Sequence, residues 1–185
     1  MERESFSAAF ADWRRQVVPK LEHAGKSLAD WPLDETTWKQ ICNAVAKSYR
    51  RGREAFARVL KRSSQGNLHD WRKKVKELWY QLRLLEPLNR VVLKEIADNA
   101  KTLADLLGRG HDFAFLLNRL DKEKGDLQLE NERTELERLI RKLTRRLQRN
   151  VTELGRRFYA EPPKAFAKRI SIFIEAWASR KKRTK

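Results

Sequence analysis

The sequence predicts an all-α fold, an antiparallel helical bundle of about six or seven helices with a basic groove or cavity. Apolar residues recur at helical spacing along almost the whole chain of 185 residues. Runs of β-branched residues are almost absent, and short stretches of Gly, Pro and Asn separate the amphipathic segments. Short connections make neighbouring helices antiparallel. We therefore expect one domain over residues 1–178 and a basic, disordered tail over 179–185.

The first half of the chain is predicted to form three helices. The first spans residues 6–28, with a kink at Pro19. The second spans residues 34–62 from an acidic N-cap and carries an apolar stripe at helical spacing. The third begins at the N-cap Asn67 and stops at Pro87.

The second half is predicted to form four more helices. A fourth spans residues 88–107, and the glycines of the segment 108–110 break it before a shorter fifth over 111–124. A long sixth helix spans residues 129–159 and directs a leucine-rich stripe inward. The prolines at 162–163 open the seventh.

The charge of the chain points to an anionic partner. The net charge is +17, and residues 138–185 alone carry +13. Such an excess attracts polyanions over about a Debye length. Nucleic acid, an anionic membrane surface and inorganic phosphate chains all satisfy this requirement, and charge alone does not choose among them.

Composition excludes several other classes of protein. The single cysteine, Cys42, cannot build a disulfide framework and has no CxxC partner for zinc. No apolar stretch approaches the roughly 20 residues of a membrane span, and the chain does not start like a signal peptide. We therefore expect a soluble, cytoplasmic protein without a cofactor, a metal or a catalytic residue.

The predicted third helix sorts its charges by face. At about 100° per residue, the apolar residues from Leu68 to Leu85 share one arc, and Asp70, Glu77 and Gln81 lie on its far side. Like charges one turn apart destabilise a helix by a few tenths of a kcal/mol, so a flank that gathers them is suited to an anion. The alternative is an ordinary solvated basic face. The near flank carries His69, Arg72, Lys73, Lys76, Tyr80 and Arg83.

The second helix carries further cations around Gly52, which would let another helix or a ligand approach the backbone. Arg50 and Arg53 share one flank and are the better candidates, whereas Arg51 fits a solvated charge as well. Lys47 lies one turn earlier.

His111 follows Arg109 and Gly110 at the predicted start of a helix, where free amides and the helix dipole would accept a phosphate. A simple N-cap at this position is the alternative.

On the predicted sixth helix, the angular count places one set of cations about 180° from the leucine stripe, as a solvated outer face. Arg141 and Arg146 lie nearer the core boundary and are candidates for a groove. The outer set is Arg138, Lys142, Arg145 and Arg149.

Residues 68–82, which include His69-Asp70-Trp71-Arg72-Lys73, resemble the signature helix of the CHAD family, the conserved histidine α-helical domain. Residues 49–53, Tyr49-Arg50-Arg51-Gly52-Arg53, resemble the Tyr-Arg-rich helix upstream of it. Residues 103–112, which end in Gly108-Arg109-Gly110-His111-Asp112, resemble the downstream Leu-Gly-x-x-His-Asp segment. The resemblance covers roughly residues 45–120 in the family's order and spacing.

This resemblance implies a helical bundle with a basic central cavity that binds inorganic polyphosphate without turning it over. It also places Tyr49 among the binding residues. Members of the family usually have two copies of the histidine helix, whereas this chain has one, and it resembles mainly the second half. A homodimer with a twofold interface would place two basic stripes face to face.

The leading hypothesis is therefore a non-catalytic polyphosphate-binding module, in the cytoplasm or on polyphosphate granules. An RNA- or DNA-binding helical protein is the main alternative, although the Trp and Phe residues lie mostly on apolar stripes and no recognition motif stands out. A metal-dependent phosphohydrolase built on His69-Asp70 and His111-Asp112 is less favoured. Three histidines leave it short of ligands, and the adjacent cations repel a metal.

Overall fold

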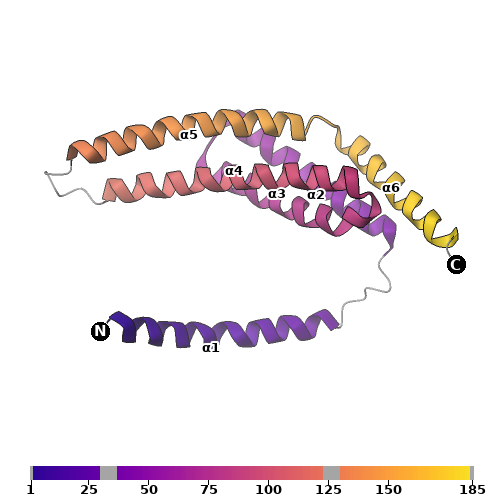
Figure 1. Cartoon of the computed structure of the whole chain (residues 1–185), viewed down its shortest axis with the longest axis horizontal. Coiled ribbons are helices and arrows are strands. Elements are labelled where there is room, and N and C mark those ends of the chain that lie inside the picture. Colours follow the sequence, from indigo (N-terminus) through magenta and orange to yellow (C-terminus); the bar gives the residue numbers. More distant parts are fainter. Residues whose placement is uncertain (1, 30–36, 123–129, 184–185) are drawn as a thin grey trace. The chain divides into compact units, whose positions relative to one another are not determined.

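The structure is a computed structural model that describes residues 2–29, 37–122 and 130–183. These residues form six α-helices and one short 3-10 helix, with no strand among them, which confirms the predicted all-α fold (Figure 1). None of the described helices has the length and apolar character that a bilayer span requires. In chain order the elements are α1 (Glu2–Ala29), α2 (Trp38–Lys61), α3 (Gln65–Leu85), η2 (Glu86–Leu88), α4 (Arg90–Lys122), α5 (Glu130–Phe158) and α6 (Pro163–Arg183).

The chain divides into two compact units, residues 1–37 and residues 38–185. The first unit consists of α1, which contains Pro19 and in which the rings of Phe10 and Trp13 stack with centroids 5.7 Å apart. The predicted N-cap Asp34 lies outside the described residues.

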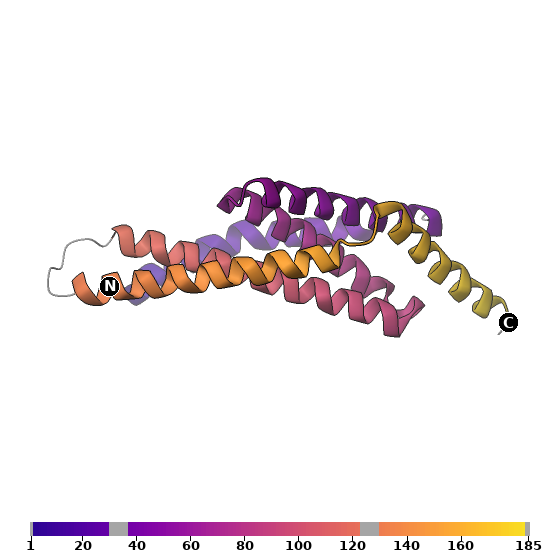
Figure 2. The ribbon, with the colours of Figure 1, turned by 90° about the horizontal axis from the view of Figure 1, so that it is seen from above.

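The second unit is a bundle of five helices. α2, α3 and α4 run antiparallel in chain order, and α5 returns along α4 (Figures 1 and 2). After Phe158 the chain turns, and α6 packs against α2. This arrangement brings the end of α2, the start of α3, the middle of α4 and the middle of α5 to one region of the bundle, where the candidate site lies.

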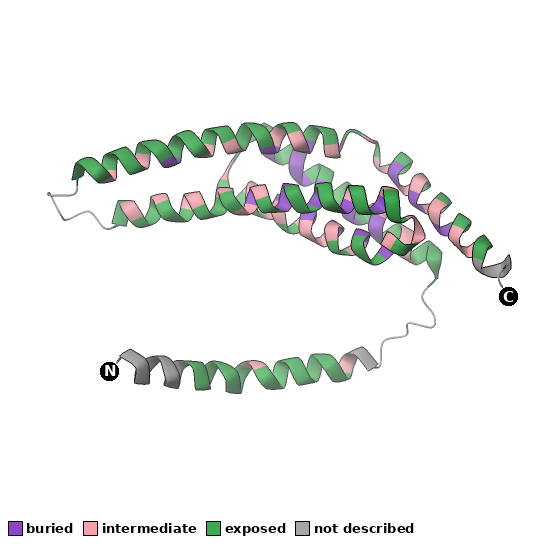
Figure 3. Ribbon diagram, viewed as in Figure 1, coloured by how far each residue is buried: buried purple, intermediate pink, exposed green. Residues whose placement is uncertain are grey.

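The core is built from the predicted apolar stripes of α2 and α3 (Figure 3). Trp71 is fully buried, and its ring lies 4.7 Å from that of Phe56. A Cβ added at Gly155 of α5 would fall 2.7 Å from Phe56 and 2.8 Å from Trp71, so only glycine lets α5 cover these rings. Gly52 likewise makes room for the ring of Tyr159, as expected of a position that permits close approach.

The leucine stripe of α5 is less buried than the sequence predicts. Ile140 and Val151 are buried, but Leu136, Leu139 and Leu143 are exposed. The first half of α5 packs beside the last part of α4 alone (Figure 3). Its apolar stripe is wide enough to contact two helices, so part of the stripe stays exposed.

Three helix boundaries differ from those expected. Ser64, not Asn67, is the N-cap of α3, because its hydroxyl accepts the backbone N–H of Asn67 at 3.3 Å. α4 is continuous from Arg90 to Lys122, so the predicted break at residues 108–110 and the separate fifth helix are wrong. α6 continues to Arg183, past the point where the disordered tail was expected to begin.

Candidate anion-binding site

Apart from Lys74, the cations of α3 lie on an edge of the helix that carries no carboxylate. His69, Lys73 and Arg83 are exposed, and Arg72 and Lys76 are half-buried. Within the described residues, none of these five side chains forms an ion pair. We call this surface, formed by His69, Arg72, Lys73, Lys76 and Arg83, the basic edge.

The acids of α3 are engaged elsewhere. Asp70 pairs with Arg58 of α2 at 2.6 Å. Glu77 pairs with Lys74 at 3.4 Å and accepts the hydroxyl of Ser48, also on α2, at 3.1 Å. The face of α3 toward α2 therefore holds the negative charge, which leaves the charge of the basic edge uncompensated.

The two aromatic residues near the end of this edge lie against its cations. Tyr80 is half-exposed, and the ammonium of Lys76 lies 5.8 Å from its ring centroid. The guanidinium of Arg83 lies 5.9 Å from the ring of Trp79. Both distances fit cation–π contacts, which hold the long side chains near the helix surface.

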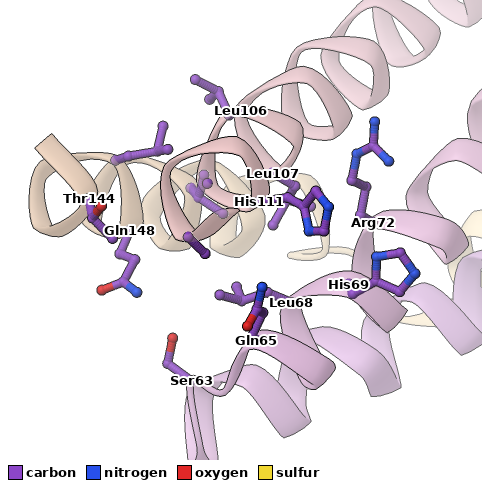
Figure 4. Close-up of a pocket in the computed structure, with 14 residues that line it drawn as sticks. Ser63, Gln65, Leu68, His69, Arg72, Leu106, Leu107, His111, Thr144 and Gln148 are labelled. Carbon is purple, nitrogen blue, oxygen red and sulfur yellow. The ribbon is translucent and has the colours of Figure 1, made fainter. Parts of the chain in front are cut away.

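A cavity of about 130 Å³ opens beside the start of the basic edge. Its walls come from α3, α4 and α5, and its floor is apolar, with Leu107, Leu147 and Val151 among the lining residues. Figure 4 shows His69, His111 and Arg72 gathered at one end, and Ser63, Gln65 and Gln148 at the other. The imidazoles of His69 and His111 approach with ring centroids 5.9 Å apart. We call this space the histidine cavity.

Arg72 is held against α4 at a glycine. A Cβ at Gly108 would fall 3.3 Å from Nε of Arg72 and 3.4 Å from Nη2. Nε of Arg72 is buried and has no hydrogen-bond partner among the described residues. A buried donor without an acceptor destabilises a protein by about 1–3 kcal/mol.

The continuous course of α4 corrects the expectation for His111. This residue is in the middle of a helix, so its backbone N–H and those of the glycines before it are directed along the helix to carbonyl groups. The site has no free helix N-terminus to receive a phosphate at residue 111. His111 instead contributes its side chain to the cavity, and Arg109 is exposed outside it.

The α2 residues predicted for the site are not brought to the histidine cavity. Arg50 and Arg53 line a separate hollow of about 560 Å³ between α2, α5 and α6, and Arg50 also lies 3.9 Å from Glu54. Lys47 and Arg51 are exposed on α2 and line neither the cavity nor this hollow.

Tyr49 is a core residue. It is 1% exposed, its ring stacks on Phe166 with centroids 4.0 Å apart, and its hydroxyl donates to the carbonyl of Glu161 at 2.9 Å. Burial raises the pKa of Tyr49 to about 12, and the nearby carboxylate of Glu161 adds to the effect. The hydrogen bond of the hydroxyl joins α2 to the turn before α6. Because the ring is buried, Tyr49 does not contact an anion bound at the surface.

Sequence reasoning missed a second basic surface, on α5. Lys142, Arg145 and Arg149 were expected on a solvated outer face, but they line a groove of about 860 Å³ against the end of α2. Arg156 lines the same groove, whereas the preferred candidates Arg141 and Arg146 do not. The spacing of these cations at one-turn intervals was the available signal. The position of a residue around the α5 axis does not reveal which other helix packs beside that face, because this depends on the packing of the bundle.

The described residues contain no group of three or more His, Cys, Asp or Glu side chains arranged to hold a metal ion.

The fold thus defines an all-α bundle whose third helix exposes a basic edge beside a cavity with two histidines. The sequence model of the CHAD domain family matches residues 2–121, which is most of the chain, and the protein therefore belongs to this family. The match includes α1, which the motifs between residues 45 and 120 did not reach, and it ends at α4. No curated protein and no solved structure matches the chain.

Proposed function

We propose that this protein binds inorganic polyphosphate, without catalysing its turnover, at the basic edge and the histidine cavity. One observation carries the proposal: the acids of α3 are paired with α2 or with Lys74, while the cations of the basic edge have no carboxylate partner among the described residues. A polymer with a negative charge on every repeat and no bases is suited to such a row of donors. Arginine in particular binds phosphoryl oxygens through two parallel hydrogen bonds.

Membership in the CHAD domain family supports the same ligand, because the motifs of residues 68–82 imply polyphosphate binding. The nucleic-acid alternative needs exposed aromatic rings on which bases stack. Trp71 is fully buried and Trp38 packs edge-on against Trp177, so these rings serve the fold, and Tyr80 is the one half-exposed ring described beside the basic edge.

The test is a titration of polyphosphate into the protein by calorimetry. The variant R72A/K73A/K76A removes three cations of the basic edge, and we expect its affinity to fall at least tenfold. The control R90Q/K94Q/K101Q removes the same formal charge from the exposed face of α4. Lys94 and Lys101 each pair with an acid of α4, and Arg90 lies 4.0 Å from Glu86 of η2. We expect the control to bind nearly as tightly as the unmodified protein.

Equal losses in the two variants would show diffuse attraction to a basic protein and contradict a defined site. Displacement of polyphosphate by double-stranded DNA or RNA at equal phosphate concentration would favour the nucleic-acid alternative. Release of phosphate from polyphosphate in the presence of Mg²⁺ or Mn²⁺, lost in His69→Ala, would contradict the non-catalytic role.

A further inference from the structure

The groove between α2 and α5 is a concave surface, and its α5 wall lies outside the part of the chain that matches the family. Val59 and Leu60 of α2, with Ser63 of the turn that follows, form one wall, and the outer face of α5 forms the other. The first and the last of the four cations on α5 are fourteen positions apart, which is about 21 Å of helix at 1.5 Å per residue. They are Lys142, Arg145, Arg149 and Arg156.

These four cations lack carboxylate partners within the described part of the chain. Glu153 is the one acid that lines the groove, and it pairs with Arg157. In the first half of α5, Glu130, Glu135 and Glu137 pair with Arg133, Arg138 and Arg141 instead.

Unpaired cations at one-turn spacing repel one another, and a concave surface of one sign focuses its field on an incoming anion. The groove has the charge and the shape of a site for an extended polyanion.

The groove adjoins the histidine cavity. Ser63, in the turn after α2, lines both, and so does Gln148 of α5. Figure 4 shows Ser63 and Gln148 at the end of the cavity away from the two imidazoles. The hydroxyl and the amide are neutral hydrogen-bond donors at the junction of two basic surfaces. A chain that enters between the histidines can therefore leave past these two residues and continue along α5.

We propose that the histidine cavity and the α5 groove form one track for a single polyphosphate chain, and that the groove selects for long chains. This inference rests on the proposed function and adds the length of polymer that the site favours. A short polyphosphate is held in the cavity by His69, Arg72 and His111. Only a longer one also reaches the cations of α5, where each further phosphate contact displaces condensed counterions.

The experiment compares tripolyphosphate with long-chain polyphosphate in calorimetric titrations at several salt concentrations. The variant K142Q/R145Q/R149Q removes three groove cations. We expect its affinity for the long chain to fall at least tenfold and its affinity for tripolyphosphate to stay unchanged. The slope of log K against log salt for the long chain should become shallower by about 2, by the rule of about 0.7 per contact for a single-stranded polyanion.

The control is again R90Q/K94Q/K101Q, with the same change of net charge, and circular dichroism confirms that both variants keep their helix content. A groove variant that binds long chains as tightly as the unmodified protein would overturn the track, as would equal losses in the control. If R72A/K73A/K76A still loses tripolyphosphate in either case, the proposed function stands and the inference alone fails. If the unmodified protein binds neither ligand, the proposed function and the inference fail together.

Discussion

The guanidinium of Arg72 on α3 lies against the backbone of α4 at Gly108, with Nε 3.3 Å from the position that a Cβ would occupy. This contact sets the position of the arginine next to the two histidines. It also explains a glycine in the middle of a long helix, where glycine destabilises by about 1 kcal/mol relative to alanine.

Gly108→Ala should therefore change stability and binding in opposite directions. The alanine raises helix propensity by about 1 kcal/mol, whereas its methyl group displaces the guanidinium. We expect an equal or higher melting temperature together with about a tenfold loss of polyphosphate affinity, the equivalent of one hydrogen bond to a charged group. Calorimetry measures both quantities.

Gly110→Ala is the matched control for this change. A Cβ at Gly110 meets only Cδ2 of Leu147, at an ordinary 3.6 Å, so the propensity gain comes without displacing Arg72. Equal affinities of the two variants would show that Arg72 is not positioned by Gly108.

Gly155→Ala should destabilise the protein although it also replaces a glycine within a helix. Its Cβ would fall under 3.0 Å from both Phe56 and Trp71, and neither buried ring has free space to move into. We expect a net loss of about 1–3 kcal/mol in the free energy of unfolding, as for other overpacked cores. Urea denaturation followed by tryptophan fluorescence measures it, and a gain in stability would contradict the packing of α5 described above.

Tyr49→Phe tests the pH dependence of stability. Burial raises the pKa of Tyr49 to about 12, above the value near 10 of an unfolded tyrosine. Between about pH 10 and 12 the unfolded chain loses this proton and the folded protein keeps it, so the stability due to the neutral phenol is lost as pH rises.

At pH 8 the variant should be less stable than the unmodified protein by about 1 kcal/mol, because the hydroxyl no longer donates to the carbonyl of Glu161. The difference should shrink as the pH is raised through 10 to 12 in urea titrations. A difference that stays constant would place Tyr49 in contact with solvent.

The sequence predicts the faces of α2 and α3 well because a single helix contains the information. The 3.6-residue period places Trp71 and Val75 in the core and separates Arg72 from Asp70 without reference to any neighbour. The family motifs add that this helix carries the site.

The features that the sequence predicts wrongly depend on which other helices surround each helix. Two glycines near residue 108 weaken α4 locally, but Leu103, Ala104 and Leu107 are buried in the bundle, so packing keeps the helix intact. The cations of α5 form a groove because the end of α2 lies beside them. The helical period places Tyr49 on the apolar stripe of α2, and only the family resemblance made it a binding residue. Phe166 and Glu161, more than a hundred residues later, enclose it in the core. Such long-range pairings are absent from local spacing.

Gly108 and Gly110 also weaken the turn of α4 that contains them. Glycine residues lower the free energy of local unfolding, so amide hydrogens near residue 110 should exchange with deuterium sooner than those of the buried turn at Leu103. An anion that links Arg72 to His111 ties this turn to α3 and slows the exchange. Hydrogen exchange at the backbone amides near residue 110 would therefore report whether an anion occupies the histidine cavity.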